Sequence, residues 1–205
     1  MPPGSTRLAA YRSTPCPEDR PANWSHPIGP NGAFDRGQRS ASLSLDQWLR
    51  ERARASEGLS ARTYVLCPTN EPDRVVGYFS ISTAVEQRNA LPSAKLRRGM
   101  PEQVPLLLIG RLAVDAEWHG RGLGSALLVD ALTRCLAASE IVEARGVVAH
   151  AIDDAAVGFY ERHGFVRSPL GERVMLLPIE TVRSLVTRWH ITQSVLRLSH
   201  ALPPD

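Results

Sequence analysis

The stretch LLLIGRLAVDAEWHGRGLGSALL, residues 106–128, decides the fold. Residues 105–109 are the longest apolar run and predict a buried strand over 106–114, and residues 120–138 carry apolar side chains at helical spacing. The joining segment, HGRGLGS at residues 119–125, has glycines at alternate positions. A turn of this kind exposes backbone N–H groups at the positive end of the helix dipole, and its glycines let an anion approach. The segment therefore predicts a pyrophosphate site, to which Arg121 can add charge.

Two common nucleotide loops fit these glycines poorly. A nucleoside-triphosphate loop needs a lysine after its last glycine, whereas Ser125 follows Gly124 directly. A Rossmann site needs an acid about 20 residues further on, after a second strand. Glu140 and Glu143 stand at about that distance but near the end of the predicted helix. A glycine turn that binds no ligand is the remaining alternative.

The flanking segments predict further strands and helices. TYVLC (63–67) and VVGYFSIST (75–83) favour a β-hairpin, because a turn-forming cluster separates them. Strands that alternate with helices in the second half indicate an α/β or α+β domain. The other expected elements are a helix at 44–56, a polar loop at 86–102, a buried strand at 146–152, a helix at 153–163 capped by Asp153 or Asp154 and ended by Gly164, a hairpin of 165–168 with 174–177, and a helix from 179 onward.

The composition excludes several classes of protein. The 205 residues carry a net charge of +3, and no run approaches the roughly 18 apolar residues that a membrane-spanning helix needs. Cys16, Cys67 and Cys135 are odd in number and far apart, which argues against structural disulfides and metal ligation and for a reducing, cytoplasmic setting. Residues 1–25 are rich in Pro, Ser and Arg and predict a disordered tail.

Three segments, in this order, resemble the GCN5-related N-acetyltransferase (GNAT) family: LIGRLAVDAEWHGRGLGSALL (108–128), VVAHAI (147–152) and AVGFYERHGF (156–165). The resemblance implies a mixed central sheet flanked by helices, with acetyl-CoA as co-substrate and no metal. The family loop (Q/R)-x-x-G-x-(G/A) is matched except at its first position, where His119 stands. The cofactor-binding residues that the resemblance implies are Leu112, Ala113 and Val114, whose strand pairs with pantetheine, and His119, Gly120, Arg121, Gly122, Leu123, Gly124 and Ser125.

The resemblance also implies a catalytic acid. In many GNAT members the tyrosine of a segment like FYERHGF, residues 159–165, donates a proton to the departing CoA thiolate, which assigns that role to Tyr160. Reference pKa values of about 10 for tyrosine and about 8.5 for a thiol are compatible with this transfer. The alternative is that Tyr160 is only a buried aromatic residue of the core.

No general base stands out among the acids and histidines near these motifs. Asp115 and Glu117 have the alternative of being loop acids, and His150 that of a strand-face histidine. An α-amine has a pKa of about 7.7–8.0, and an adjacent ester lowers it further. An enzyme acting on such an amine can rely on positioning and water.

The N-terminal half resembles the GNAT toxins of bacterial toxin–antitoxin pairs, which acetylate the α-amine of aminoacyl-tRNA and block translation. The sequence departs from the family pattern in Ser-Ala-Arg for Ser-Arg and in Phe79 for a second tyrosine. This resemblance implies aminoacyl-tRNA as substrate and an antitoxin protein as a candidate partner. The segments that carry it are His26, FDRG (34–37), LDQWLRERA (45–53), SARTYV (60–65) and VGYF (76–79).

Basic side chains offer contacts for a tRNA backbone. The candidates are Arg62, Lys95, Arg97 and Arg98, together with Arg50, Arg52 and Arg54 of the helix at 44–56. A solvated helix face is the alternative for the last three.

The expected domains are a tail at 1–25, the GNAT domain at 26–178 and a C-terminal helix and tail at 179–205. We expect the apolar stripe of that helix to pack on the domain or at a homodimer contact. Three functions stay open: a toxin acting on aminoacyl-tRNA, an acetyltransferase for a small-molecule, protein or peptide amine, and a noncatalytic acyl-CoA-binding module.

Overall fold

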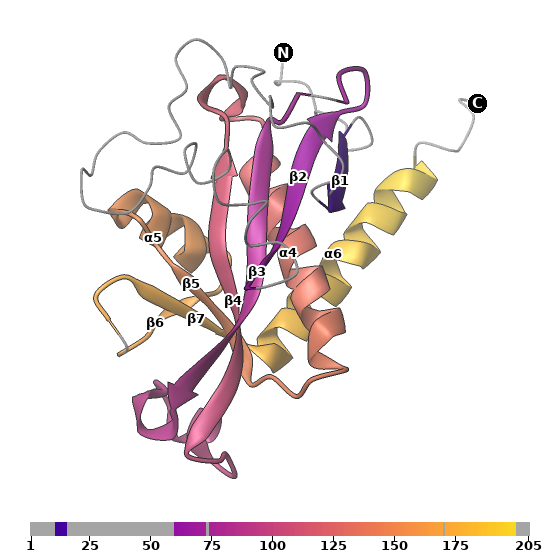
Figure 1. The fold of residues 1–205 in the computed structure, drawn as a ribbon. Helices are drawn as coiled ribbons and strands as arrows, with labels where there is room; N and C mark the ends of the chain where they lie inside the picture. The colour runs from indigo at the N-terminus through magenta and orange to yellow at the C-terminus, as the bar shows by residue number, and fades with distance from the viewer. Residues whose placement is uncertain (1–10, 16–59, 73, 170, 200–205) are drawn as a thin grey trace. The chain divides into compact units, whose positions relative to one another are not determined.

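The computed structural model describes residues 11–15, 60–72, 74–169 and 171–199 (Figure 1). They form a mixed α+β fold, which confirms the predicted fold class. The predicted helix at 44–56 lies outside the described residues. The elements are β1 (Tyr11–Pro15), β2 (Arg62–Pro68), β3 (Gly77–Gln87), η2 (Arg88–Ala90), α3 (Ala94–Arg97), β4 (Gln103–Val114), η3 (Ala116–Trp118), α4 (Leu123–Ser139), β5 (Gly146–His150), α5 (Asp154–Arg162), β6 (Val166–Arg167), β7 (Val174–Pro178) and α6 (Ile179–Ser199).

The chain divides into two compact units. The first comprises Met1–Thr83 and Ile109–Ala131, and the second comprises Ala84–Leu108 and Leu132–Asp205. Strands β3 and β4 and helix α4 each contribute residues to both units.

In the first unit the strands follow the order β1-β2-β3-β4. Strands β2 and β3 pair antiparallel, which confirms the predicted hairpin. The Tyr64 and Phe79 rings stack across this pair at 5.0 Å between centroids. A Cβ at Gly77 would lie 2.8 Å from the Leu127 side chain and 3.0 Å from the carbonyl oxygen of Ala113. Glycine is therefore the residue that lets α4 pack closely against β3 and β4 here.

The prediction of a disordered tail is wrong for residues 11–15, which form β1 at the edge of the sheet. This strand pairs antiparallel with β2, from Tyr11 opposite Pro68 to Pro15 opposite Tyr64. Ladder hydrogen bonds to a neighbouring strand depend on the backbone, so a polar sequence can make them. The composition of residues 1–25 does not reveal that β2 is the strand with which residues 11–15 pair.

In the second unit the strands follow the order β4-β5-β7-β6. Strand β7 pairs antiparallel with both β5 and β6, which confirms the predicted final hairpin. Helix α5 begins as expected, because the Asp153 side chain accepts a hydrogen bond from the Ala156 N–H at 2.7 Å. It ends before Gly164, whose φ of +86° suits the left-handed conformation. The core of this unit includes Leu91, Leu96, Val104, Leu106, Val148 and Leu176.

The prediction of a polar loop over residues 86–102 is wrong in part. Strand β3 continues to Gln87, and η2 and α3 follow before β4 begins. The Ser93 hydroxyl accepts a hydrogen bond from the Leu96 N–H at 3.3 Å, and the Leu96 side chain is buried in the core. A capping serine and one anchoring leucine are enough for a single helical turn but too little for a periodic pattern.

Helix α6 confirms the predicted C-terminal helix and packs within the second unit. It contacts β5 and β7 and buries Val182 and Val186, and Leu185 and Trp189 are half-buried. Among the described residues, no helix has the length and apolarity that crossing a membrane requires.

Removing residues 179–205 is expected to lower the melting temperature and cause aggregation, because the apolar surface under Val182 and Val186 becomes exposed. Thermal unfolding and light scattering after size exclusion measure both effects. A chain that ends at Ser199 is the matched control and should behave like the full chain. Equal stability and solubility of the two truncations would show that α6 is dispensable.

Candidate active site

The glycine loop between β4 and α4 presents unpaired backbone donors. The N–H groups of Gly120, Arg121, Gly122, Leu123 and Gly124 donate no hydrogen bond to any described residue. Helix α4 begins at Leu123 rather than at residue 120, because Gly120 and Gly122 have φ values of +73° and +76° that no α-helix contains. No atom lies within 4 Å of where a Cβ would stand on either glycine. The loop is therefore open toward an approaching anion.

The His119 side chain closes this loop onto the end of β4. Its Nε2 lies 2.9 Å from the carbonyl oxygen of Val114. Because a carbonyl oxygen only accepts, Nε2 must carry the proton in this contact. The histidine that stands in place of the family's Gln or Arg thus has a structural role, because it holds the loop against β4. The carbonyl of Val114 is already engaged by this hydrogen bond.

A short polar turn connects β4 to the loop. Asp115 is 3% exposed, and its Oδ1 accepts a hydrogen bond from the Glu117 N–H at 2.9 Å. This bond caps η3 and fixes the course of the chain into the glycine loop. The two acids left open as bases therefore have other contacts: Asp115 caps a turn, and Glu117 pairs with Arg74 at 3.2 Å.

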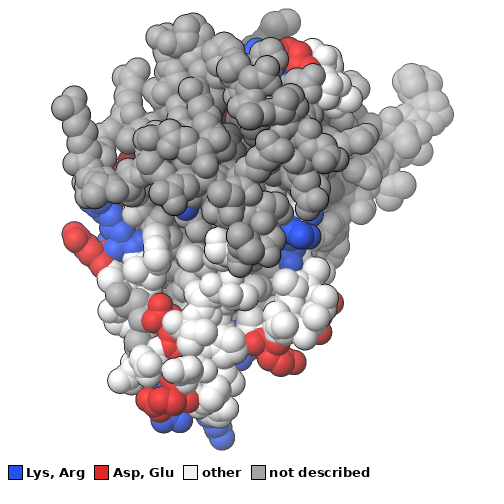
Figure 2. Space-filling view, in the orientation of Figure 1, with Lys and Arg blue, Asp and Glu red and all other residues white. Residues whose placement is uncertain are grey.

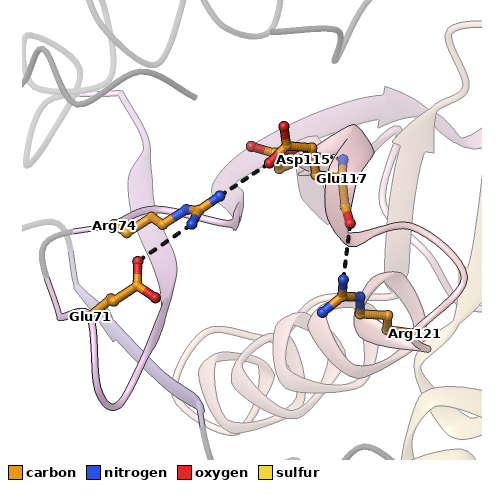
Figure 3. Close-up of polar contacts among 5 residues, drawn as sticks. All are labelled: Glu71, Arg74, Asp115, Glu117 and Arg121. Atoms are coloured by element: carbon orange, nitrogen blue, oxygen red, sulfur yellow. Dashed lines mark hydrogen bonds and ion pairs between the residues drawn. The ribbon is translucent and has the colours of Figure 1, made fainter. Parts of the chain in front are cut away.

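Two arginines lie at the Trp118 ring beside the loop. The guanidinium carbons of Arg121 and Arg74 are 4.6 and 5.5 Å from the ring centroid, within range of a cation–π interaction. Figure 3 shows Arg74 between the carboxylates of Glu71 and Glu117, at 3.4 and 3.2 Å. Arg121 donates a hydrogen bond to the backbone carbonyl of Glu117, at 3.3 Å.

These contacts compensate the positive charges of the two arginines to different extents. Two carboxylates compensate Arg74, whereas no described carboxylate pairs with Arg121. Arg121 is also part of the glycine loop itself. It is therefore the guanidinium with charge available for an anion bound at the loop.

Tyr160 lies on α5 in the second unit, and its side chain is almost fully buried. Its ring makes edge contacts with Phe159 at 5.4 Å and with Phe165 at 5.1 Å. Burial raises the pKa of Tyr160 to about 12. The phenol is therefore protonated at physiological pH, which is the form that has a proton to donate.

The basic residues expected to meet a nucleic acid divide between the units. Lys95, Arg97 and Arg98 lie together at α3 in the second unit, and all three are exposed. Arg62 lies at the start of β2 in the first unit. Figure 2 shows positive and negative side chains interspersed on the described part of one face. The helix bearing Arg50, Arg52 and Arg54 lies outside the described residues.

No sequence motif points to Arg74 or to the position of Trp118. Arg74 stands 43 residues before Glu117 in the chain, and only the turn into β3 brings the two together. Within the described residues, no group of three His, Cys, Asp or Glu side chains could hold a metal ion.

A strand, an open glycine loop and a helix place the chain among α/β proteins that bind a ligand at a helix N-terminus. The chain belongs to the GNAT acetyltransferase family: residues 60–167 match the family described as "Acetyltransferase (GNAT) domain". It is an N-acetyltransferase of this family, as the sequence motifs predict.

A relative of known activity is similar to this chain in sequence, and solved structures are similar to it in fold. A "tRNA-acetylating toxin" of Mycobacterium tuberculosis is 37% identical over 148 residues, which cover 72% of this chain and 87% of the relative. The crystal structure of a tyrosine-to-phenylalanine mutant of KacT superposes with a TM-score of 0.72 at 24% identity, over 86% of this chain and 99% of that chain. AtaT complexed with acetyl-methionyl-tRNAfMet gives a TM-score of 0.71 at 23% identity, over 85% of this chain and 98% of that chain.

Proposed function

We propose that the protein is a toxin that transfers an acetyl group from acetyl-CoA to the α-amine of an aminoacyl-tRNA and so blocks translation. The observation that carries this proposal is the 37% identity to a tRNA-acetylating toxin over 72% of the chain. The exposed basic residues at α3 are consistent with a polyanionic substrate. Because aminoacyl-tRNA is used in the cytoplasm, we expect the protein to act there.

Acetyl-CoA binds through its diphosphate to the N–H groups of residues 120–125, with Arg121 adding charge. Backbone groups of Leu112 and Ala113 pair with the pantetheine arm. The related AtaTR has been crystallised with AcCoA. The domain that performs this chemistry spans residues 26–178, with α6 as an addition.

The reaction needs a nucleophile that attacks the acetyl group and an acid that protonates the departing sulfur. The amine nitrogen attacks the acetyl carbonyl carbon, the C–S bond breaks, and the sulfur takes the electron pair. Tyr160 donates its proton to the sulfur, and the proton lost by the nitrogen returns to the tyrosinate through water. The products are the acetylated aminoacyl-tRNA and CoA with a free thiol. An α-amine has a pKa of about 7.7–8.0, and the adjacent ester of the aminoacyl-tRNA lowers it further, so a substantial fraction is already neutral near pH 7–8 and can attack without a protein base.

Labelled acetyl-CoA with charged and with uncharged tRNA tests this function directly. Label is expected on charged tRNA only, because uncharged tRNA lacks the α-amine. Efficient labelling of polyamines, aminoglycosides or protein N-termini, with none on charged tRNA, would favour a small-molecule or protein acetyltransferase. Binding of acetyl-CoA without any transfer would favour the noncatalytic module.

An antitoxin is the partner that this function implies, since the structure of AtaT has been determined with the C-terminus of its antitoxin AtaR. Expression of the toxin in bacteria should arrest growth by blocking translation. Co-expression with the antitoxin encoded by a small neighbouring gene should relieve that arrest. A second copy of the chain is the other candidate partner, and light scattering of the purified protein determines its oligomeric state.

Arg121→Gln is expected to weaken acetyl-CoA binding by about ten- to a hundredfold, the range for losing a hydrogen bond to a charged group. Arg74→Gln is the matched control, because Arg74 faces the same Trp118 ring but its charge is already paired. Its affinity should stay within about fivefold of wild type. Calorimetry measures both, and equal losses in the two variants would remove the specific role of Arg121.

A further inference from the structure

Arg145 joins four elements of the second unit through its backbone and side chain. It precedes β5, and its N–H donates to the carbonyl of Pro105 on β4 at 2.9 Å. Its own carbonyl accepts from the N–H of Ile179, the first residue of α6, at 3.1 Å. These two backbone hydrogen bonds fix the backbone position of Arg145, from which its side chain extends.

The Arg145 guanidinium connects α3 to α6. Its Nε and Nη2 donate to the carbonyls of Leu96 and Lys95, at 3.4 and 3.2 Å. Its Nη1 pairs with the carboxylate of Glu180 in the first turn of α6. The Arg145 side chain is 19% exposed and that of Glu180 is 54% exposed, so solvent screens this contact mainly from the carboxylate side. The planar fork of an arginine directs separate N–H donors to the two carbonyls and the carboxylate in a fixed geometry.

Helix α3 needs such support. It is a single turn of four residues, too short to be stable by its own hydrogen bonds. Lys95 and Arg97 lie on it and Arg98 is its C-cap, and none of the three forms an ion pair with a described residue. By contrast, the nearby Arg88 pairs with Glu102 at 3.3 Å. Three cations within four residues, with no described carboxylate beside them, repel one another, which opposes an ordered turn unless outside contacts hold it.

We propose that Arg145, held by Glu180, is a positioning residue that fixes α3 so that Lys95, Arg97 and Arg98 meet the phosphates of tRNA together. This inference rests on the proposed action on aminoacyl-tRNA. The donors of Arg145 are directed to backbone carbonyls, so the charges of the α3 side chains stay available. The first turn of α6 thereby takes part in substrate binding without contacting the substrate.

The test compares Arg145→Met, Glu180→Gln and Arg183→Gln in the full chain. Arg183 pairs with Glu140, the residue after α4, at 3.2 Å, so its variant removes an ion pair of α6 that is made to another part of the unit than α3. Aminoacylated tRNA is titrated by filter binding at several salt concentrations, and acetyl-CoA is titrated by calorimetry. Arg145→Met is expected to weaken tRNA binding about tenfold and to flatten its salt dependence, because fewer phosphates are neutralised together. Glu180→Gln should show a smaller loss of the same kind, and Arg183→Gln none.

Kinetics separate positioning from a general loss of structure. The KM for aminoacyl-tRNA should rise in Arg145→Met and Glu180→Gln, whereas the KM for acetyl-CoA and kcat at saturating substrate should not change. Arg145→Lys should restore part of the tRNA affinity, since an ammonium keeps the charge but not the fork. A parallel loss of acetyl-CoA and tRNA affinity would overturn the proposal in favour of a purely structural role. If Arg145→Met does not fold, Glu180→Gln against Arg183→Gln decides.

A triple variant with glutamine at positions 95, 97 and 98 distinguishes this inference from the proposed function. If it binds charged tRNA as tightly as wild type, α3 is not the tRNA surface and the inference fails, while acetylation of tRNA can still be observed. If the triple variant binds weakly but the Arg145 and Glu180 variants bind normally, the surface is correct and the positioning role is wrong.

Discussion

Tyr160→Phe is expected to lower kcat by about 10²–10⁴-fold, the usual contribution of one positioned proton donor. Acetyl-CoA affinity should not change, because the substitution removes only the phenolic hydroxyl. The edge contacts of the ring with Phe159 and Phe165 survive it, so the fold should be retained. Single-turnover transfer to charged tRNA measures the effect, with calorimetry as the binding control. A variant with near-wild-type kcat would leave Tyr160 as a packing residue of the core.

The raised pKa of Tyr160 predicts how activity and stability depend on pH. With a pKa of about 12, the phenol keeps its proton to well above pH 10, so loss of this acid should not lower kcat between pH 7 and pH 10. The unfolded chain releases the same proton at about pH 10. Burial therefore stabilises the fold below pH 10, and this contribution is lost as the pH rises from about 10 to about 12.

Melting temperatures across that range isolate the contribution of Tyr160. Burial also raises the pKa of the Cys135 thiol to about 12, so wild type and Tyr160→Phe share that part of the alkaline destabilisation. The variant, which has no proton to lose at this position, should lose less stability than wild type between pH 10 and pH 12. Parallel curves would contradict the burial of an ionisable phenol.

The elements that could be predicted from sequence are those whose signal is local. The β2–β3 hairpin, the capped helix α5 and the glycine loop each carry their own turn or cap residues, such as Asp153 and Gly164. Helix α4 starts three residues later than the sequence predicts, because apolar spacing does not reveal that Gly120 and Gly122 take left-handed conformations. Helix α3 was missed because its stability comes from Ser93, the buried Leu96 and the distant Arg145.

In the candidate site, too, features with a local sequence signal could be predicted and features that depend on long-range contacts could not. The loop residues from His119 to Ser125 follow from one continuous motif, and so does Tyr160 within its own segment. The difference between Arg121 and Arg74 could not be predicted, because it depends on which carboxylates the fold places beside each guanidinium. Such pairings are long-range and leave no periodic pattern.

Gly122→Asp is expected to abolish acetyl-CoA binding. The glycine is exposed, and no atom lies within 4 Å of its Cβ position, so the carboxylate has room in front of the loop where the diphosphate is proposed to bind. Two like charges about 4 Å apart near a protein surface repel by about 4 kcal/mol, which corresponds to on the order of a thousandfold in affinity.

Two controls separate this repulsion from backbone strain. Gly122→Asn has the same size without the charge and tolerates positive φ comparably, so it should bind within about tenfold of wild type. Gly99→Asp places the same residue at a φ of +72° with equally open surroundings in the second unit, and its acetyl-CoA affinity should not change. Calorimetry on all three, with melting curves to show that each is folded, makes the comparison. If folded Gly122→Asp binds acetyl-CoA like wild type, the diphosphate does not lie on this loop, and the anion site must be sought elsewhere in the chain.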